Sequence, residues 1–350
     1  MQIDAIAEEH STVRSVDDAS SVHHDSIEFQ LATSRAHRTL GSSARLQRTF
    51  IEASRSAHAH HTQAHRARPA LENDMITVLN IDSKPRIPVA EGHIRNVLSP
   101  SDDGTRVHVA FENVDPAKTC HLMPSDRTQV VYILEGRDAA VTHTAAGQTS
   151  EYAAQRREGV YLEPGEEVTV TASTTPLTLL LVSVPKHTGK PTGHESSGGY
   201  FFVETQLRSL VDEKRIRERT FWVNKETGLS GSWDLQLGRM IYAPGAYSPR
   251  HVHHASKTSS VTPEHFYLIE TGTGEVKHDA GSLAVGPGDL VLIPAGEWHQ
   301  LIASESGFDY IEFQAPFDFT TTMDHDPQGK NWYIKGTDDG TGKPKLWVQS

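Results

Sequence analysis

Short β-rich segments separated by turns occur in two similar series along this chain. The first series lies between Arg86 and Pro185 and comprises Val107–Phe111, Gln129–Leu134, Val160–Leu162, Val168–Thr171 and Leu177–Val184. The second lies between Phe221 and Phe313 and comprises Trp233–Tyr242, Glu264–Glu270, Gly274–His278, Leu290–Ile293 and Tyr310–Phe313. Many short strands at close spacing, with few helical periods, are typical of an all-β sandwich or barrel. The sequence therefore predicts two β domains in tandem.

The two series also match each other residue by residue. Gln129–Gly136 aligns with Glu264–Thr271, so that a tyrosine falls on a tyrosine and a glutamate on a glutamate. Glu158–Gly165 aligns with Gly288–Ala295, with proline on proline. Internal similarity of this kind predicts two copies of one structural unit.

Metal-ligating residue types gather in the second copy. His251 and His253 stand two apart on an expected strand, Glu264 opens the next one, and His299 follows the turn at Pro294–Gly296. Side chains two apart on a strand point to the same face, so the first two imidazoles can converge on one ion. Imidazole and carboxylate together suit a first-row divalent metal.

This stretch resembles the cupin superfamily. Gly245, His251 and His253 fit the opening of the family's first motif, and the run from Gly288 through Pro294–Gly296 to His299 fits its second motif without a gap. Two features depart from the pattern: ten residues separate His253 from Glu264, and Thr271 stands where a glycine is expected. The resemblance implies an all-β bicupin: two tandem cupin barrels (double-stranded β-helix, or jelly-roll), here with a short connecting helix and a disordered N-terminal tail.

Two adjacent residues, Glu264 and His265, are candidates for the fourth metal ligand. The repeat aligns Glu264 with Gln129, which favours Glu264 as the carboxylate ligand. Six residues separate Gln129 from Gly136, and the same gap before Gly272 selects His265 instead. We expect the set His251, His253, Glu264 and His299, with His265 as the alternative.

The first copy offers a poorer set of donors, namely His121, Met123, Gln129 and either Val168 or Thr169. These cannot hold a hard or borderline divalent ion well, so we expect one metal per chain. Fe(II) is the first expectation, with Mn(II), Ni(II) and Zn(II) as alternatives.

Strand alternation suggests the walls of the pocket. If Glu264 faces inward, Phe266 and Leu268 do so too, and Leu301 shares the face of His299. This lining is apolar and suits a flat or aromatic substrate. Arg239 could anchor a substrate oxyanion or be an exposed strand-end arginine.

The resemblance, with an apolar pocket, implies a mononuclear metal-dependent dioxygenase acting with O2 on a small hydroxylated aromatic or enolic compound. Size and two-barrel plan are similar to the large subunit of hydroquinone dioxygenases, which implies a homo-oligomer such as a dimer, or a smaller partner subunit. The alternatives are a redox-neutral isomerase, decarboxylase or lyase on a small oxo- or sugar acid, and a non-catalytic ligand-binding cupin.

Composition narrows the partners and the compartment. The net charge of −12 disfavours nucleic acid and anionic membranes as partners. A single cysteine, Cys120, excludes an intramolecular disulfide framework and fits a reducing compartment. No apolar run reaches the ~18–20 residues that span a bilayer, and no signal peptide is evident. We expect a cytoplasmic protein.

The expected regions follow from these patterns. Residues 1–74 have eight arginines, no lysine and few apolar residues, which indicates a disordered tail. The helix is expected within Thr205–Arg219, where apolar residues recur at helical spacing. The regions are a tail over 1–74, an N-terminal cupin without metal over 75–185, a linker with the helix over 186–220, a metal-binding cupin over 221–320 and a tail over 321–350 that packs on a barrel or a partner.

Overall fold

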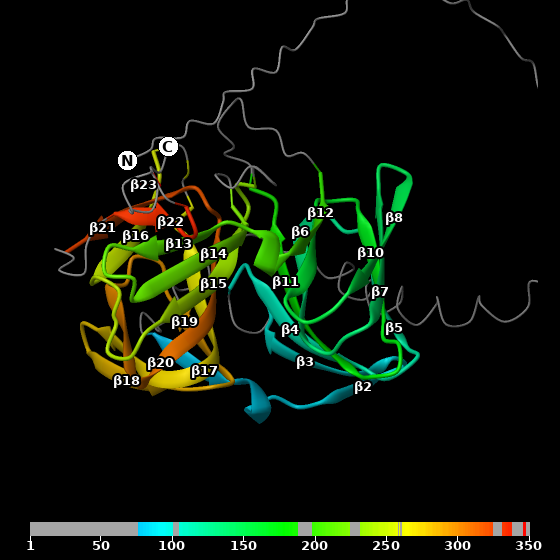
Figure 1. Cartoon of the computed structure of the whole chain (residues 1–350), viewed down its shortest axis with the longest axis horizontal. Coiled ribbons are helices and arrows are strands. Elements are labelled where there is room, and N and C mark those ends of the chain that lie inside the picture. The colour runs from blue at the N-terminus through cyan, green and yellow to red at the C-terminus, as the bar shows by residue number, and fades with distance from the viewer. Residues whose placement is uncertain are drawn as a thin grey trace, which may run out of the picture. The chain divides into compact units, whose positions relative to one another are not determined.

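The computed structural model describes residues 76–100, 105–187, 198–224, 232–257, 259, 261–324, 331–337 and 346–347. These residues form strands with two short 3-10 turns, so the all-β prediction is confirmed (Figure 1). The predicted disordered tail, residues 1–74, lies outside the described residues. Within the described part of the chain, no helix has the length and apolarity needed to cross a bilayer.

The N-terminal barrel is built from two antiparallel sheets. The larger has the order β12-β9-β6-β11-β4-β3-β2 and the smaller β5-β10-β7-β8. Their strands are β2 (Ile87–Val89), β3 (Gly92–Leu98), β4 (His108–Val114), β5 (Thr119–Leu122), β6 (Arg127–Glu135), β7 (Ala139–Ala145), β8 (Gln148–Ala154), β9 (Glu158–Leu162), β10 (Glu167–Thr171), β11 (Leu177–Pro185) and β12 (Tyr200–Val203). The interior is apolar and includes Cys120, Val131, Ile133, Val168 and Leu179.

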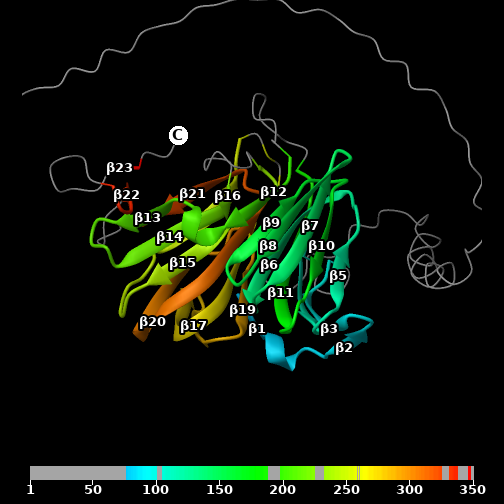
Figure 2. The same ribbon diagram turned by 45° about the vertical axis from the view of Figure 1, so that its right-hand side comes forward.

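The C-terminal barrel is one twelve-stranded sheet, in which β20, β15 and β14 are neighbours (Figure 2). Its strands are β1 (Thr77–Asn80), β13 (Ser209–Asp212), β14 (Arg217–Val223), β15 (Gln236–Tyr242), β16 (His251–Ala255), β17 (Glu264–His278), β18 (Gly281–Val285), β19 (Asp289–Ile293), β20 (His299–Ala315), β21 (Phe319–Met323), β22 (Trp332–Ile334) and β23 (Leu346–Trp347). Its interior includes Met240, Tyr267, Val291, Leu301 and Tyr310.

Each barrel includes one strand that comes from outside its own stretch of sequence. Strand β1, which precedes the N-terminal barrel, pairs with β19 of the C-terminal barrel. Strand β12, which precedes the C-terminal barrel, pairs with β9 of the N-terminal one. The boundary predicted at residue 75 therefore falls before a strand that belongs to the other barrel.

A shared apolar core joins the two barrels. The outward faces of β6 and β11 contribute Tyr132 and Leu180, and those of β17 and β20 contribute Phe266 and Phe313. The ring of Tyr132 stacks on Trp222, with 3.9 Å between ring centroids. The strands facing this core are therefore buried on both sides, which explains their nearly continuous apolar sequences.

The helix expected within Thr205–Arg219 is not formed, and this prediction was wrong. The segment is a 3-10 turn at Glu204–Gln206 followed by the hairpin of β13 and β14. The carboxylate of Asp212 accepts from the backbone N–H of Ile216 at 2.9 Å, which fixes the turn. Pairing of β13 and β14 with their neighbours overrides the helical spacing of the apolar residues.

Candidate metal centre

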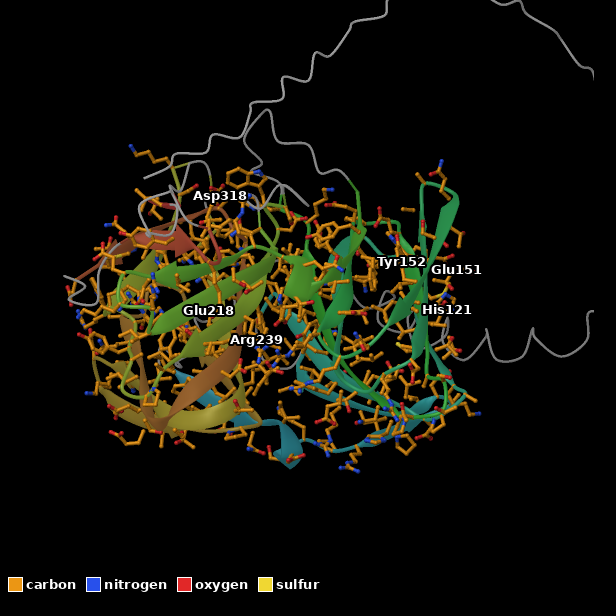
Figure 3. The ribbon with its side chains drawn as sticks, in the orientation of Figure 1. His121, Glu151, Tyr152, Glu218, Arg239 and Asp318 are labelled. Carbon is orange, nitrogen blue, oxygen red and sulfur yellow. The ribbon has the colours of Figure 1, made fainter. Side chains whose placement is uncertain are left out.

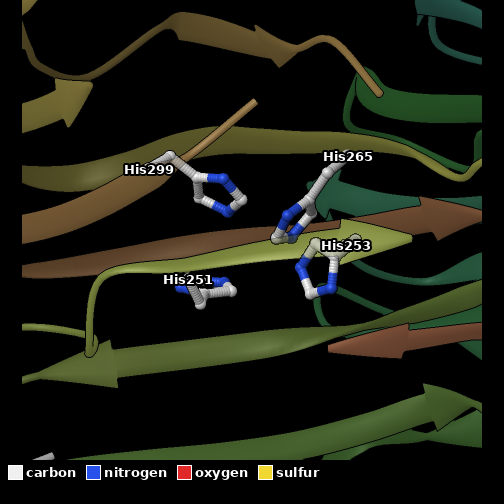
Figure 4. A group of neighbouring side chains, drawn as sticks. All are labelled: His251, His253, His265 and His299. Atoms are coloured by element: carbon white, nitrogen blue, oxygen red, sulfur yellow. The ribbon is translucent and has the colours of Figure 1, made fainter. Parts of the chain in front are cut away.

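Four histidines from three strands meet inside the C-terminal barrel (Figure 4). His251 and His253 lie on β16, His265 on β17, and His299 begins β20. One ring nitrogen from each lies within 4.8 Å of the others. The strand pairing accounts for this, because His251 lies directly opposite His299 in the ladder between β16 and β20. The predicted convergence of His251, His253 and His299 is therefore present.

Three of the four rings are held through their Nδ1 atoms. His251 Nδ1 donates to the carbonyl of Pro249 at 2.8 Å, and His299 Nδ1 donates to that of Glu297 at 2.9 Å. His253 Nδ1 contacts Thr321 Oγ1 at 2.9 Å. A ring that donates through Nδ1 carries its lone pair on Nε2, so these contacts direct Nε2 lone pairs toward the common space.

Burial keeps these rings neutral. It lowers the pKa of His251, and it lowers the pKa values of His253, His265 and His299 well below the ordinary range, an effect to which repulsion among the rings adds. His299 Nε2 and His265 Nδ1 are buried without a hydrogen-bond partner. Neutral imidazoles with unpaired buried nitrogens are ready metal ligands, so this donor set fits a divalent ion.

Glu264 lies outside this group, which corrects the expected ligand set. Its carboxylate accepts from Thr105 Oγ1 and from the backbone N–H of Arg106, both at 3.0 Å, in the N-terminal barrel. Neighbouring residues on a strand point to opposite faces, so the inward place belongs to His265. The structure therefore assembles the alternative set of four histidines.

The strand pairing shows why the sequence alignment of the two copies selected Glu264 instead of His265. Gln129 pairs with Leu162 and Ser183 in the N-terminal barrel, and His265 pairs with Ile293 and Gln314 at the matching place in the other. Gly136, directly after β6, and Gly272, at an irregularity within β17, both adopt positive φ angles (111° and 80°). Gln129 thus corresponds to His265, and the match of tyrosine on tyrosine was one residue out of register.

The same register error affects the predicted pocket. Phe266 and Leu268 belong to the core between the barrels rather than to the surroundings of the histidines. Leu301 does lie in the interior of the C-terminal barrel. The prediction for Phe266 and Leu268 was wrong because they alternate with His265 along β17.

Arg239 is bound within the protein and is not a substrate anchor (Figure 3). Its side chain is 5 % exposed and forms ion pairs with Asp309, Glu204 and Glu270. Tyr132 donates to Glu204 at 2.8 Å, so this buried cluster links the two barrels. A guanidinium shared by three carboxylates has few donors left for a ligand.

Two polar side chains that the sequence reading missed lie beside the histidines. Glu312 Oε1 contacts His265 Nε2 at 2.7 Å, and Gln314 Nε2 contacts His265 Nε2 at 2.9 Å and His253 Nε2 at 3.2 Å. The alternation from Tyr310 to Gln314 carried the signal, because every second residue there is polar or tyrosine and faces inward. The surroundings of the histidines therefore combine these two polar groups with aromatic rings, since Phe319 lies 4.8 Å from His253 and Tyr267 4.5 Å from His265 between ring centroids.

Glu312 is a buried carboxyl group with a raised pKa. Burial raises its pKa to about 6, although Arg219 and His251 act in the opposite direction. A carboxyl group with a pKa close to the working pH can both accept and release a proton.

The donors expected in the N-terminal copy do not converge. His121 lies on β5, the edge strand of the smaller sheet (Figure 3). Its side chain is 46 % exposed, and Met123 is 61 % exposed. Cys120 and Val168 face inward among apolar residues.

Comparisons with known proteins agree with this architecture. Residues 238–308 match a family model described as a cupin domain. The oxalate decarboxylase of Bacillus subtilis superposes with a TM-score of 0.57 at 11 % identity, covering 73 % of this chain and 79 % of that one. That of Lactobacillus farciminis, in a formate complex, gives 0.57 at 12 % identity and covers 73 % and 90 %. Protein Ylba from E. coli gives 0.53 at 16 % identity and covers 71 % and 94 %.

A search among curated proteins gives no match. At these identities the structural likeness establishes the fold. The chain has the bicupin fold, two tandem cupin barrels, and residues 238–308 match the cupin domain, as the sequence motifs predicted. Its four-histidine group lies within the barrel that matches the cupin family model.

Proposed function

We propose that this chain is a metal-dependent enzyme that carries out redox-neutral proton-transfer chemistry on a small oxo- or sugar acid. The observation that carries the proposal is Glu312, a carboxyl with a raised pKa in contact with His265. An apolar lining was the reason to expect an aromatic substrate, and the two polar side chains in contact with the histidines, Glu312 and Gln314, support the alternative instead. The likeness to two oxalate decarboxylases is in keeping with this class of reaction.

The residues divide the work between binding and proton transfer. One divalent ion would be held by the four histidines His251, His253, His265 and His299, and it would polarise a carbonyl or stabilise an enolate. Glu312 accepts the proton from the carbon next to the carbonyl and returns it to the same or the adjacent carbon. In a decarboxylation the same carboxyl delivers a proton to the carbon that has lost CO2.

The metal follows from the donor set. Four neutral nitrogens suit iron, nickel or zinc better than a harder ion that prefers oxygen. One structure of the Bacillus subtilis oxalate decarboxylase is described through its Mn(II) centres. We propose one ion per chain, with Fe(II), Ni(II) and Zn(II) ahead of Mn(II).

Hydrogen–deuterium exchange tests the proposed reaction. Protein loaded with each metal is incubated without oxygen in D2O with a panel of 2-oxo acids and sugar acids, and deuterium entering carbon is followed by NMR. We expect metal-dependent exchange that falls about 10²–10⁴-fold in Glu312→Gln, the usual effect of removing a general base. Glu275→Gln, on β17 with a side chain 38 % exposed, is the matched control. Undiminished exchange in Glu312→Gln would contradict the proposal.

Dioxygenase chemistry is the second candidate, because four imidazoles are suitable ligands for Fe(II). It predicts uptake of O2 in step with loss of a catechol- or hydroquinone-type compound, abolished in His251→Ala. A dimer, or a complex with a smaller subunit, belongs to this second proposal. Full turnover without oxygen would exclude it.

A further inference from the structure

Three buried amide side chains form a row that ends at the histidines. Asn224, Gln236 and Gln314 are 1 %, 7 % and 2 % exposed. Gln236 and Gln314 face each other across the ladder between β15 and β20, and Asn224 directly follows β14. A buried amide must find hydrogen-bond partners, so three in succession are costly unless their order is fixed.

The row has a direction. Asn224 Nδ2 donates to Gln236 Oε1 at 3.1 Å, and Gln236 Nε2 donates to Gln314 Oε1 at 3.5 Å. The oxygen of each glutamine therefore faces back along the row. The NH2 group of Gln314 is the end presented to His253 and His265. The row thus brings a donor, and not an acceptor, to the histidines.

The NH2 group of Gln314 loses the histidine nitrogens as hydrogen-bond acceptors when a metal ion occupies the site. His253 is anchored through Nδ1, so its Nε2 lone pair would bind the ion. His265 Nε2 also contacts Glu312, and a ring nitrogen that donates to a carboxylate cannot accept from an amide. An NH2 nitrogen is itself no metal ligand. With the ion in place, Gln314 is left as a buried donor directed at the reaction space.

We propose that Gln314 donates a hydrogen bond to a carboxylate or enolate oxygen of the substrate, and that Gln236 and Asn224 hold its amide in the donating orientation. This rests on the proposed function, because it assumes an ion among the four histidines. Gln314 and Glu312 stand two apart on β20 and share its inward face. One therefore binds the anionic oxygen, while the other moves the proton.

Anion binding to the cobalt-loaded protein tests the role of Gln314 without requiring turnover. Cobalt(II) is bound to the parent chain and acetate is titrated, with the visible absorption of the cobalt as the signal. In Gln314→Met, which keeps the bulk of the side chain but removes the donor, we expect one cobalt per chain. We also expect at least a tenfold weaker affinity for acetate, equivalent to about 1.4 kcal/mol.

The direction of the row is tested at Gln236, whose amide contacts Asn224 and Gln314. Gln236→Glu can still accept from Asn224 but can no longer donate, so it draws the NH2 of Gln314 away from the histidines. We expect Gln236→Glu to weaken acetate binding more than Gln236→Met, whereas a purely structural role would give both variants the same effect. Gln148→Glu, an exposed position on β8, adds the same charge as a control.

The outcomes separate this inference from the proposed function. A parent chain that binds no cobalt, or that keeps it in His299→Ala, overturns the metal site and the inference with it. Normal cobalt loading with unchanged acetate affinity in Gln314→Met overturns the inference alone. Equal affinities in Gln236→Glu and Gln236→Met overturn the orienting role of the row.

Discussion

Glu264 and His265 are neighbours in sequence, and replacing each by glutamine should have opposite consequences. His265 faces the other three histidines, whereas Glu264 faces the N-terminal barrel. His265→Gln should therefore impair metal binding with little direct effect on the contact between the barrels. Glu264→Gln should weaken that contact and leave the metal site intact.

The expected magnitudes follow from the contacts. Replacing residues that merely support metal ligands costs about 10–100-fold in affinity, so losing the His265 ring itself should cost at least about 100-fold. In Glu264→Gln the side chain keeps one oxygen acceptor, while a charge-assisted hydrogen bond worth about 1.5–3 kcal/mol is lost. At the 2–4 °C per kcal/mol typical of chains of this size, melting should fall by about 3–12 °C.

Two measurements on each variant decide the matter. Zinc affinity is obtained by competition with a chelating dye, and the melting temperature of the metal-free protein by calorimetry. Glu305→Gln, at an exposed position on β20, controls for removing a surface carboxylate. Loss of zinc binding in Glu264→Gln, with normal binding in His265→Gln, would refute the assignment of inward and outward faces along β17.

Three further variants probe the rest of the molecule. Trp222→Ala, which removes the ring stacked on Tyr132, should cost about 3–5 kcal/mol in urea unfolding, and a cost below ~1 kcal/mol would argue against a shared core. Arg239→Met leaves Asp309 and Glu204 buried without their cation and should cost about 3–5 kcal/mol, most of it recovered if both acids are neutralised by substitution. Burial raises the pKa of Glu166, but hydrogen bonds from a histidine and two backbone amides outweigh this and lower it below the ordinary value. Its contribution to stability is then complete above its unfolded pKa and lost as the pH falls through the folded one, so Glu166→Gln should destabilise the protein at pH 7 and much less at pH 3.

The sequence predicted the fold and three of the four histidines because both depend on local patterns. Strand alternation places His251 and His253 on one face, and Pro294 and Gly296 form the turn that precedes His299. The fourth position depends on which residue of β17 faces inward, and two candidates one residue apart differ in every contact. The matching tyrosines, 132 and 267, gave the wrong register because one faces the shared core and the other the barrel interior.

Features that depend on contacts between distant segments could not be read from the sequence. The segment predicted to be a helix has helical spacing, but it pairs with β15 and β22 on either side of its own hairpin. The residues next to Arg239 in the sequence do not indicate its three carboxylate partners, which come from positions 204, 270 and 309. Glu312 and Gln314 were predictable in principle, because they break the apolar run of a strand buried on both faces.

The pairing of β1 with β19 has a consequence for folding during synthesis. Thr77 lies opposite Leu292, so β1 leaves the ribosome more than two hundred residues before its partner. At 5–20 residues per second this strand waits about 10–40 s. Throughout that time the N-terminal barrel can close, while β1 offers its unpaired backbone to solvent, chaperones or another nascent chain. Completion of the C-terminal barrel then pairs that edge with β19, so the barrel synthesised second also shields the first strand of the described part of the chain.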